Sequence, residues 1–207
     1  MHVTLFGVVL FLHVAVAIIA FMLAGVLHAA LGVLARMRDV REMRSWVALV
    51  HRIEPVLPIM ALILLGLGAW LIHLSGKRFA WSDGWVSTSV VALVVIEALS
   101  GALIAPRSKA MTRLVHDSAD GPVSDALTRA TRDPIVWHLA HVATFGFAGV
   151  VFLMVVHPTG FLSPVIVVVA AVLGVAVSAA QLRALDEVPA GSGGVVPGQK
   201  QPAGESV

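Results

Sequence analysis

The chain has 207 residues, of which 58% are hydrophobic and only 13% are charged, and its mean hydropathy is +0.94. Soluble domains carry about a quarter charged residues, so this composition excludes a soluble globular protein and predicts an integral membrane protein with several spans. The formal net charge of +2 is too small to indicate a nucleic-acid partner, and the absence of cysteine excludes disulfides, thiolate metal sites and cysteine nucleophiles.

The first hydrophobic segment, residues 5–34, is longer than the roughly 20 residues that cross a bilayer, and no Lys or Arg precedes it. It is therefore expected to be a retained first span and not a cleaved signal. One face carries two histidines with only alanines between them, at helical spacings: His13, Ala17, Ala20, Ala24 and His28. Such a stripe lets another helix, or a flat ligand, approach the backbone closely.

An arginine-rich segment follows, in which Met37, Val40, Met43, Val47 and Val50 can share one helical face. This pattern predicts a short amphipathic helix lying on the membrane surface between the first and second spans. The second span, about residues 53–74, opens with two prolines, which a first helical turn tolerates.

The third span is expected at about residues 85–105, where Pro106 should end it, and the fourth at about residues 135–156. Asp133 and Pro134 are typical of a helix start, with aspartate as the N-cap and proline in the first turn. A fifth span follows at about residues 161–182. The fold class is thus an all-α five-helix transmembrane bundle over residues 1–184. Residues 185–207, rich in Gly, Pro, Ser and Gln, are predicted to be a disordered cytoplasmic tail.

The basic residues of the loops predict the orientation. Five lie between the first two spans and five between the third and fourth: Arg36, Arg38, Arg41, Arg44, Arg52, Arg107, Lys109, Arg113, Arg129 and Arg132. The second loop has two, and the fourth loop and the N-terminus have none. By the positive-inside rule, the N-terminus is outside and the C-terminus is cytoplasmic.

Glu97, near the middle of the third span, is the strongest single signal for function. A carboxylate in hydrocarbon is expensive, so such a residue is expected to face the bundle interior. One interpretation is a group that carries a proton or binds a cation. The alternative is a protonated glutamate that hydrogen-bonds a neighbouring helix and has no chemistry.

Two hypotheses concern the histidines. His138 and His141 are three residues apart, a spacing that can present two nitrogens to one metal ion, with Glu97 as a further ligand if the spans converge. Alternatively, His28 and His138, at similar depth near the cytoplasmic side, can ligate a haem from two helices, with Arg36, Arg38 and Arg132 near its propionates. The alternative to both hypotheses is that these histidines lie at the membrane–water interface and are simply hydrated.

No Walker loop, nucleophile elbow, HExxH or dinucleotide fingerprint occurs in the chain, so an enzyme is not the expected class.

The chain does resemble a broad group of small, uncharacterised, multi-pass bacterial membrane proteins that are distantly similar to CopD-type proteins. The residues that carry the resemblance are Leu12-His13, Leu64-Leu65-Gly66-Leu67-Gly68, Gly84-Trp85, Pro106 and His138. Where that group has a tryptophan and paired glycines after its first histidine, this chain has Ala20, Phe21 and Met22. The resemblance implies the multi-span architecture and a bacterial plasma membrane.

The sequence leaves three functions open. The first is a small binding or transport protein that handles a proton or cation through Glu97 and nearby histidines. The second is a structural or assembly subunit, and the third is a haem b-binding membrane protein. The expected partners are the lipid bilayer and either other membrane helices or a second copy of the chain. Convergence of the polar groups on one cavity would favour the first.

Overall fold

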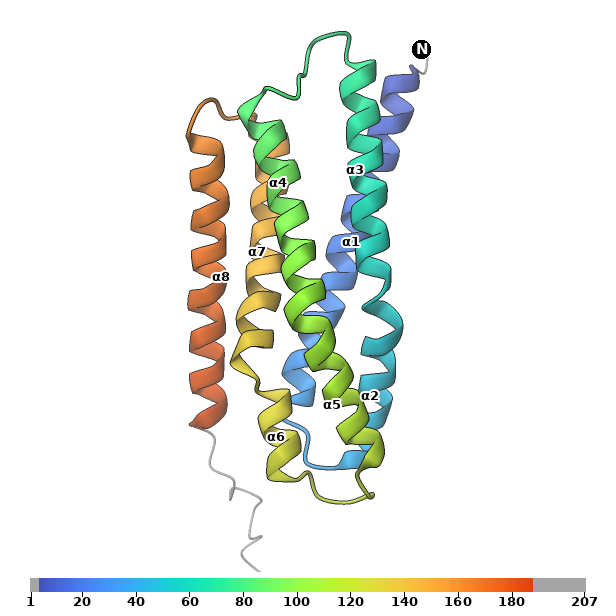
Figure 1. Cartoon of the computed structure of the whole chain (residues 1–207), viewed down its shortest axis with the longest axis vertical. Coiled ribbons are helices and arrows are strands. Elements are labelled where there is room, and N and C mark those ends of the chain that lie inside the picture. Colours follow the sequence, from blue (N-terminus) through green and yellow to red (C-terminus); the bar gives the residue numbers. More distant parts are fainter. Residues whose placement is uncertain (1–3, 188–207) are drawn as a thin grey trace, which may run out of the picture.

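The computed structural model describes residues 4–187, and over this range the chain forms helices and no strand. In chain order they are α1 (Leu5–Leu34), α2 (Val40–Ile53), α3 (Val56–Leu74), α4 (Gly84–Leu99), the π-helical turn η1 (Ser100–Ile104), α5 (Ala105–Asp117), α6 (Asp125–Thr131), α7 (Pro134–Val156) and α8 (Leu162–Asp186). They run lengthwise in one elongated bundle (Figure 1).

Five helical stretches are long and apolar enough to cross a membrane, each with a window of mean hydropathy 2.1 or more. Three of them join consecutive helices: α2 continues into α3, α4 continues through η1 into α5, and α6 leads into α7. The predicted all-α membrane bundle is confirmed. Of the predicted tail, residues 188–207 lie outside the described residues, and α8 extends to Asp186.

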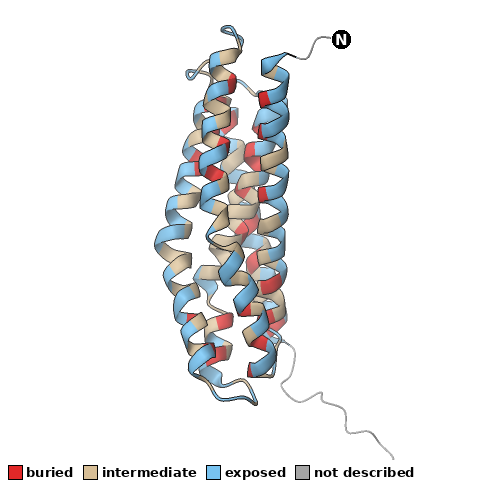
Figure 2. Cartoon of the chain, turned by 90° about the vertical axis from the view of Figure 1, so that its right-hand side faces the viewer, coloured by how far each residue is buried: buried red, intermediate tan, exposed pale blue. Residues whose placement is uncertain are grey.

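The bundle has two tightly packed sides. α7 packs on α8 and on α4, while α1 packs on α3, and contacts between α1 and α7 join the two groups. α8 approaches the α7 backbone closely at Gly174, where a Cβ atom would lie 2.8 Å from the carbonyl oxygen of His141. Exposed residues cover the outward faces of the helices, and buried residues lie between them (Figure 2). The outward faces are apolar, with Phe11, Leu62 and Val155 among the most exposed side chains, as lipid contact requires.

At the arginine-rich end, α2, α5 and α6 form a separate small hydrophobic core. Val40, Met43 and Val47 of α2 are buried in it against Val115 of α5 and Leu127 of α6. The amphipathic helix between the first two spans is therefore present, but its apolar face packs on protein and does not lie free for the membrane surface. The reason is that α5 extends far enough beyond the third span to cover it.

The prediction that Pro106 ends the third span is wrong, because the helix continues to Asp117. Proline has no N–H, so a regular helix would leave the carbonyl of Ala102 without its donor. The chain inserts the π-turn η1 just before Pro106, and the N–H of Ala105 bonds to the carbonyl of Ser100, five residues back. The wider turn carries the helix past the proline, and such π-turns recur at functional sites.

The start of α7 follows the sequence pattern. Asp133 accepts hydrogen bonds from the backbone N–H groups of Ile135 and Val136, at 2.8 and 3.4 Å, and Pro134 opens the helix. The same carboxylate also pairs with Arg107 of α5 at 3.3 Å. The predicted cap is confirmed, and it also joins the third and fourth spans at the arginine-rich end.

Candidate functional site

A cavity of about 450 Å³ lies among α1, α3, α4, η1, α5 and α7. It runs from Leu64 and Leu93, in the middle of the bundle, to His51 and Lys109 at the arginine-rich end. We call it the carboxylate cavity, because Glu97 and Glu54 both line it. It brings an acidic group in a membrane-spanning helix, Glu97, into the same cavity as charged residues at the arginine-rich end.

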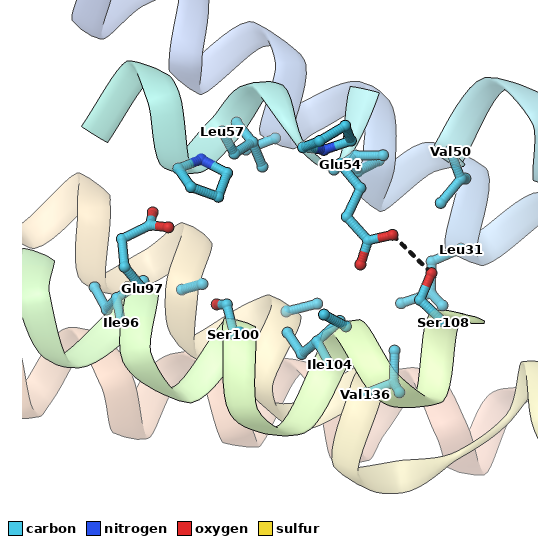
Figure 3. A pocket seen from close by; sticks show the side chains of 18 of the residues that line it. Leu31, Val50, Glu54, Leu57, Ile96, Glu97, Ser100, Ile104, Ser108 and Val136 are labelled. Carbon is cyan, nitrogen blue, oxygen red and sulfur yellow. Dashed lines mark hydrogen bonds between the residues drawn. The ribbon is translucent and has the colours of Figure 1, made fainter. Parts of the chain in front are cut away.

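Glu97 extends from α4 into the carboxylate cavity, with Ser100 of the π-turn one helical turn along (Figure 3). No hydrogen bond or ion pair within residues 4–187 holds the carboxyl group of Glu97, so it is available to a ligand. Glu54, at the junction of α2 and α3, lies further toward the arginine-rich end (Figure 3). It accepts a hydrogen bond of 2.8 Å from the hydroxyl of Ser108.

His28 of α1 also lines the carboxylate cavity and begins a polar network that crosses to α8. The hydroxyl of Thr144 donates to the carbonyl of Ala140 at 3.0 Å and therefore accepts the N–H at Nδ1 of His28, at 3.2 Å. The ring of His28 meets His141 edge to face, with ring centroids 4.0 Å apart. In turn, Nδ1 of the buried His141 donates to the carbonyl of Trp137 at 2.8 Å.

Nε2 of His141 pairs with the side-chain amide of Gln181 on α8 at 3.1 Å. Both nitrogens of His141 are therefore engaged within the protein. His28, by contrast, has only Nδ1 engaged, and its Nε2 has no hydrogen-bond partner within residues 4–187.

The structure does not bring together the predicted metal set of His138, His141 and Glu97. Within residues 4–187, no three side chains of the metal-binding types gather around a common point. Neither His138 nor His141 is among the residues that line the carboxylate cavity with Glu97. His141 is turned toward α1 and α8 by its bonds, and Nδ1 of His138 is buried with no hydrogen-bond partner among these residues.

The residues do not fit the predicted haem either. Two haem ligands must face each other across the porphyrin, but His28 packs against His141, and His138 does not line the cavity that His28 lines. Two of the arginines expected near propionates bond to the chain itself. Arg36 donates to the carbonyl of Gly32 at 2.8 Å, and Arg132 reaches the carbonyl of Ala35 and the carboxylate of Asp186, each at 3.4 Å.

The alanine stripe of α1 faces the interior and divides between two cavities. Ala20, Ala24 and His28 line the carboxylate cavity, while His13 and Ala17 line a second cavity of about 1020 Å³ in the other half of the bundle. The two cavities share Leu64, Leu93 and Phe147, which form an apolar layer between them. The absence of larger side chains along the stripe leaves room for both.

Sequence reasoning missed three members of this site. Glu54 lies where α2 continues into α3, at the end of a predicted span, and this position gave no sign that its carboxylate would line the cavity. Thr144 and Gln181 belong to no sequence motif. Their hydrogen bonds to His28 and His141 depend on which helices pack together. A second acidic residue close to an apolar stretch was the one signal that the sequence did contain.

Together, the fold and the carboxyl group of Glu97 define a multi-pass integral membrane protein with an acidic side chain in an internal cavity. The chain belongs to the DUF2269 family, described as predicted integral membrane proteins, whose model matches residues 7–158. The match includes every residue that lines the carboxylate cavity and excludes α8. No curated protein and no solved structure matches the chain. The distant similarity to CopD-type proteins stays a prediction.

Proposed function

We propose that the protein binds and releases a proton within the membrane at Glu97, through the carboxylate cavity. The observation that carries this proposal is the position of the Glu97 carboxyl group, which lines a cavity at mid-bundle and has no partner among the described residues. In apolar surroundings the charged form of a carboxyl group is costly and the protonated form is tolerated. Such a group takes up a proton where it is dry and releases it where water reaches it.

One observation favours a proton over a metal cation. Within the described residues Glu97 belongs to no group of three metal-binding side chains, and a metal ion needs several ligands to replace its water. A proton needs no such ligand set, and Glu54, hydrogen-bonded to Ser108, lies along the cavity toward the arginine-rich end and can relay it.

His28 is the second group that can exchange protons here. It lines the same cavity as Glu97, and its free Nε2 can accept a proton while Nδ1 remains bonded to Thr144. We assign it a supporting role in the transfer of the proton along the cavity. If Glu97 only held helices together, the site would instead belong to a structural subunit, and the carboxyl group would be sealed from water.

The proposal includes an orientation. By the positive-inside rule, the basic residues of α2 and α5 favour an arginine-rich end in the cytoplasm of a bacterial cell and an N-terminus outside. In this orientation the carboxylate cavity opens toward the cytoplasm, and the loop between α3 and α4, which contains Lys77, faces outward.

Single cysteines test water access and orientation, because the chain has no cysteine of its own. Lys77→Cys is expected to react with a membrane-impermeant thiol reagent in intact cells, whereas Arg113→Cys is expected to react only in inverted vesicles. Ser100→Cys, in the carboxylate cavity, should behave as Arg113→Cys does. The matched control is Leu99→Cys on the outward face of the same helix, which should react from neither side.

If Ser100→Cys reacts no faster than Leu99→Cys from either side, the cavity is not open to water. That result would favour a structural subunit over a proton-binding protein. Labelling of Lys77→Cys only in inverted vesicles would overturn the orientation without affecting the site.

A further inference from the structure

The two carboxyl groups of the carboxylate cavity lie at different levels of the bundle. Glu54 is held by Ser108, whose hydroxyl donates to it at 2.8 Å. Ser108 follows Glu97 on the same continuous helical stretch, about 16 Å further along its axis at about 1.5 Å per residue. Glu97 therefore stands alone at the inner end of the cavity, and the two carboxyl groups cannot share one small ion (Figure 3).

No positively charged side chain among the described residues pairs with Glu97. Arg107, which also lines the cavity, is engaged by Asp133 at 3.3 Å and by a backbone carbonyl at 2.8 Å. The basic side chains of His51 and Lys109 are exposed at the arginine-rich end. The carboxyl group of Glu97 thus faces the cavity, and no side chain of the described part of the chain balances its charge when it is ionised.

The polar groups that line the cavity with Glu97 offer hydrogen-bond acceptors. The hydroxyl of Ser100, one helical turn along, has no hydrogen bond within residues 4–187, and its oxygen can accept one. His28 donates from Nδ1 to Thr144, which leaves Nε2 of the neutral ring as an acceptor. An ammonium group carries three donors and no acceptor, so it matches these groups and supplies the missing positive charge.

The wall between the levels of Glu97 and Glu54 is mainly aliphatic, with Leu57 of α3 and Ile104 of η1 along it (Figure 3). The cavity volume of about 450 Å³ lies within the range of small-molecule sites, about 300–1,000 Å³. An amine attached to an apolar body can bury that body against this wall. An anion would be repelled by Glu97, and a neutral apolar molecule would leave the carboxyl group unpaired.

We propose that the carboxylate cavity binds an amphiphilic organic amine, whose ammonium group pairs with the carboxylate of Glu97 and whose apolar body lies along Leu57 and Ile104. This inference rests on the proposed function, because the protonated Glu97 releases its proton to water as the ammonium group arrives. The neutral carboxyl group is then replaced by an ion pair, so the total charge within the cavity does not change. The protein thus exchanges one proton for one organic cation at a single carboxyl group.

Calorimetric titration of the full chain in a mild, uncharged detergent, with protein-free micelles as the blank, tests this proposal. The probes are phenylbutylamine and phenylbutanol, which share one carbon skeleton and differ in the positive charge. The amine should bind saturably, and Glu97→Gln should weaken its affinity roughly 10- to 100-fold, the loss of a hydrogen bond between charged groups. The affinity for the alcohol should not change. Glu42→Gln, which removes an exposed carboxylate outside the cavity, should leave both affinities unchanged.

A second pair of variants keeps Glu97 in place. Gly101 lines the cavity, and a Cβ atom there would lie more than 4 Å from any other helix, so Gly101→Leu fits the fold and fills the space of the ligand. It should abolish binding of the amine. The matched control, Ala102→Leu, changes the exposed neighbouring residue, which does not line the cavity, and should bind the amine as the wild-type protein does.

Three results would overturn the proposal: no saturable binding of the amine, equal amine affinities of the wild-type and Glu97→Gln proteins, or an alcohol that binds as tightly as the amine. Labelling of Ser100→Cys involves no amine and therefore tests the proposed function separately. A reactive Ser100→Cys in a protein that does not bind the amine would reject the amine and leave proton exchange at Glu97 standing.

Discussion

A hydrophobic carbodiimide is expected to modify one carboxyl group, that of Glu97, and Glu97→Gln is expected to remove the adduct completely. The reagent dissolves in apolar regions and adds only to protonated carboxyl groups. Glu97 combines these conditions, because it lies in the membrane-embedded part of α4 and lines a largely apolar cavity. Glutamine keeps the size and hydrogen-bonding capacity of the side chain but offers no acidic proton.

Mass spectrometry of the protein, treated in lipid nanodiscs and then digested, locates the adduct. The control is Glu42→Gln, which removes an exposed carboxylate of α2 at the arginine-rich end and should leave the adduct in place. An adduct that persists in the Glu97→Gln protein, or that lies on Glu54 in the wild-type protein, would show that the protonated group is not the one assigned here.

Met43→Ala is expected to lower the free energy of unfolding by about 2–5 kcal/mol, the usual cost of emptying a packed methionine site. Met43 is completely buried in the core that α2 forms with α5 and α6. Leu49→Ala, at a residue of the same helix that is 38% exposed, should cost about 0.5 kcal/mol or less. Denaturant or thermal unfolding in mild detergent compares the two variants.

This pair of substitutions distinguishes the two positions proposed for α2. A helix that rests on the membrane surface would lose only a weak lipid or detergent contact at Met43, and the two variants would then be equally stable. A large difference between them shows that the apolar face of α2 packs on protein.

The spans themselves were predictable, because hydrocarbon imposes its own composition and length on a crossing helix. Residues 5–34 and the Asp133-Pro134 start of α7 show this well, since only local chemistry decides them. The inward-facing alanine stripe of α1 also follows from periodicity alone. What periodicity does not decide is which cavity each stripe residue faces, because this depends on how the neighbouring helices pack.

The predictions that the structure did not bear out also depended on how the neighbouring helices pack. Pro106 breaks a regular helix, but the π-turn before it carries the chain onward, and no local rule predicts that turn. α2 has the composition of a surface helix, and only the extension of α5 covers it with protein. Among the polar residues, His28 and Glu97 do share a cavity, while His141 bonds to α8 and His138 lies apart from them. Spacing along one helix could not separate those two histidines.

Infrared difference spectroscopy of the protein in lipid, recorded while the pH of the surrounding water is changed, tests proton exchange at Glu97 most directly. We expect a carboxyl carbonyl band that appears and disappears reversibly with pH, is present in the Glu42→Gln protein and is missing from the Glu97→Gln protein. A band that never responds to the pH of the water, or one that survives Glu97→Gln, would contradict proton exchange at Glu97.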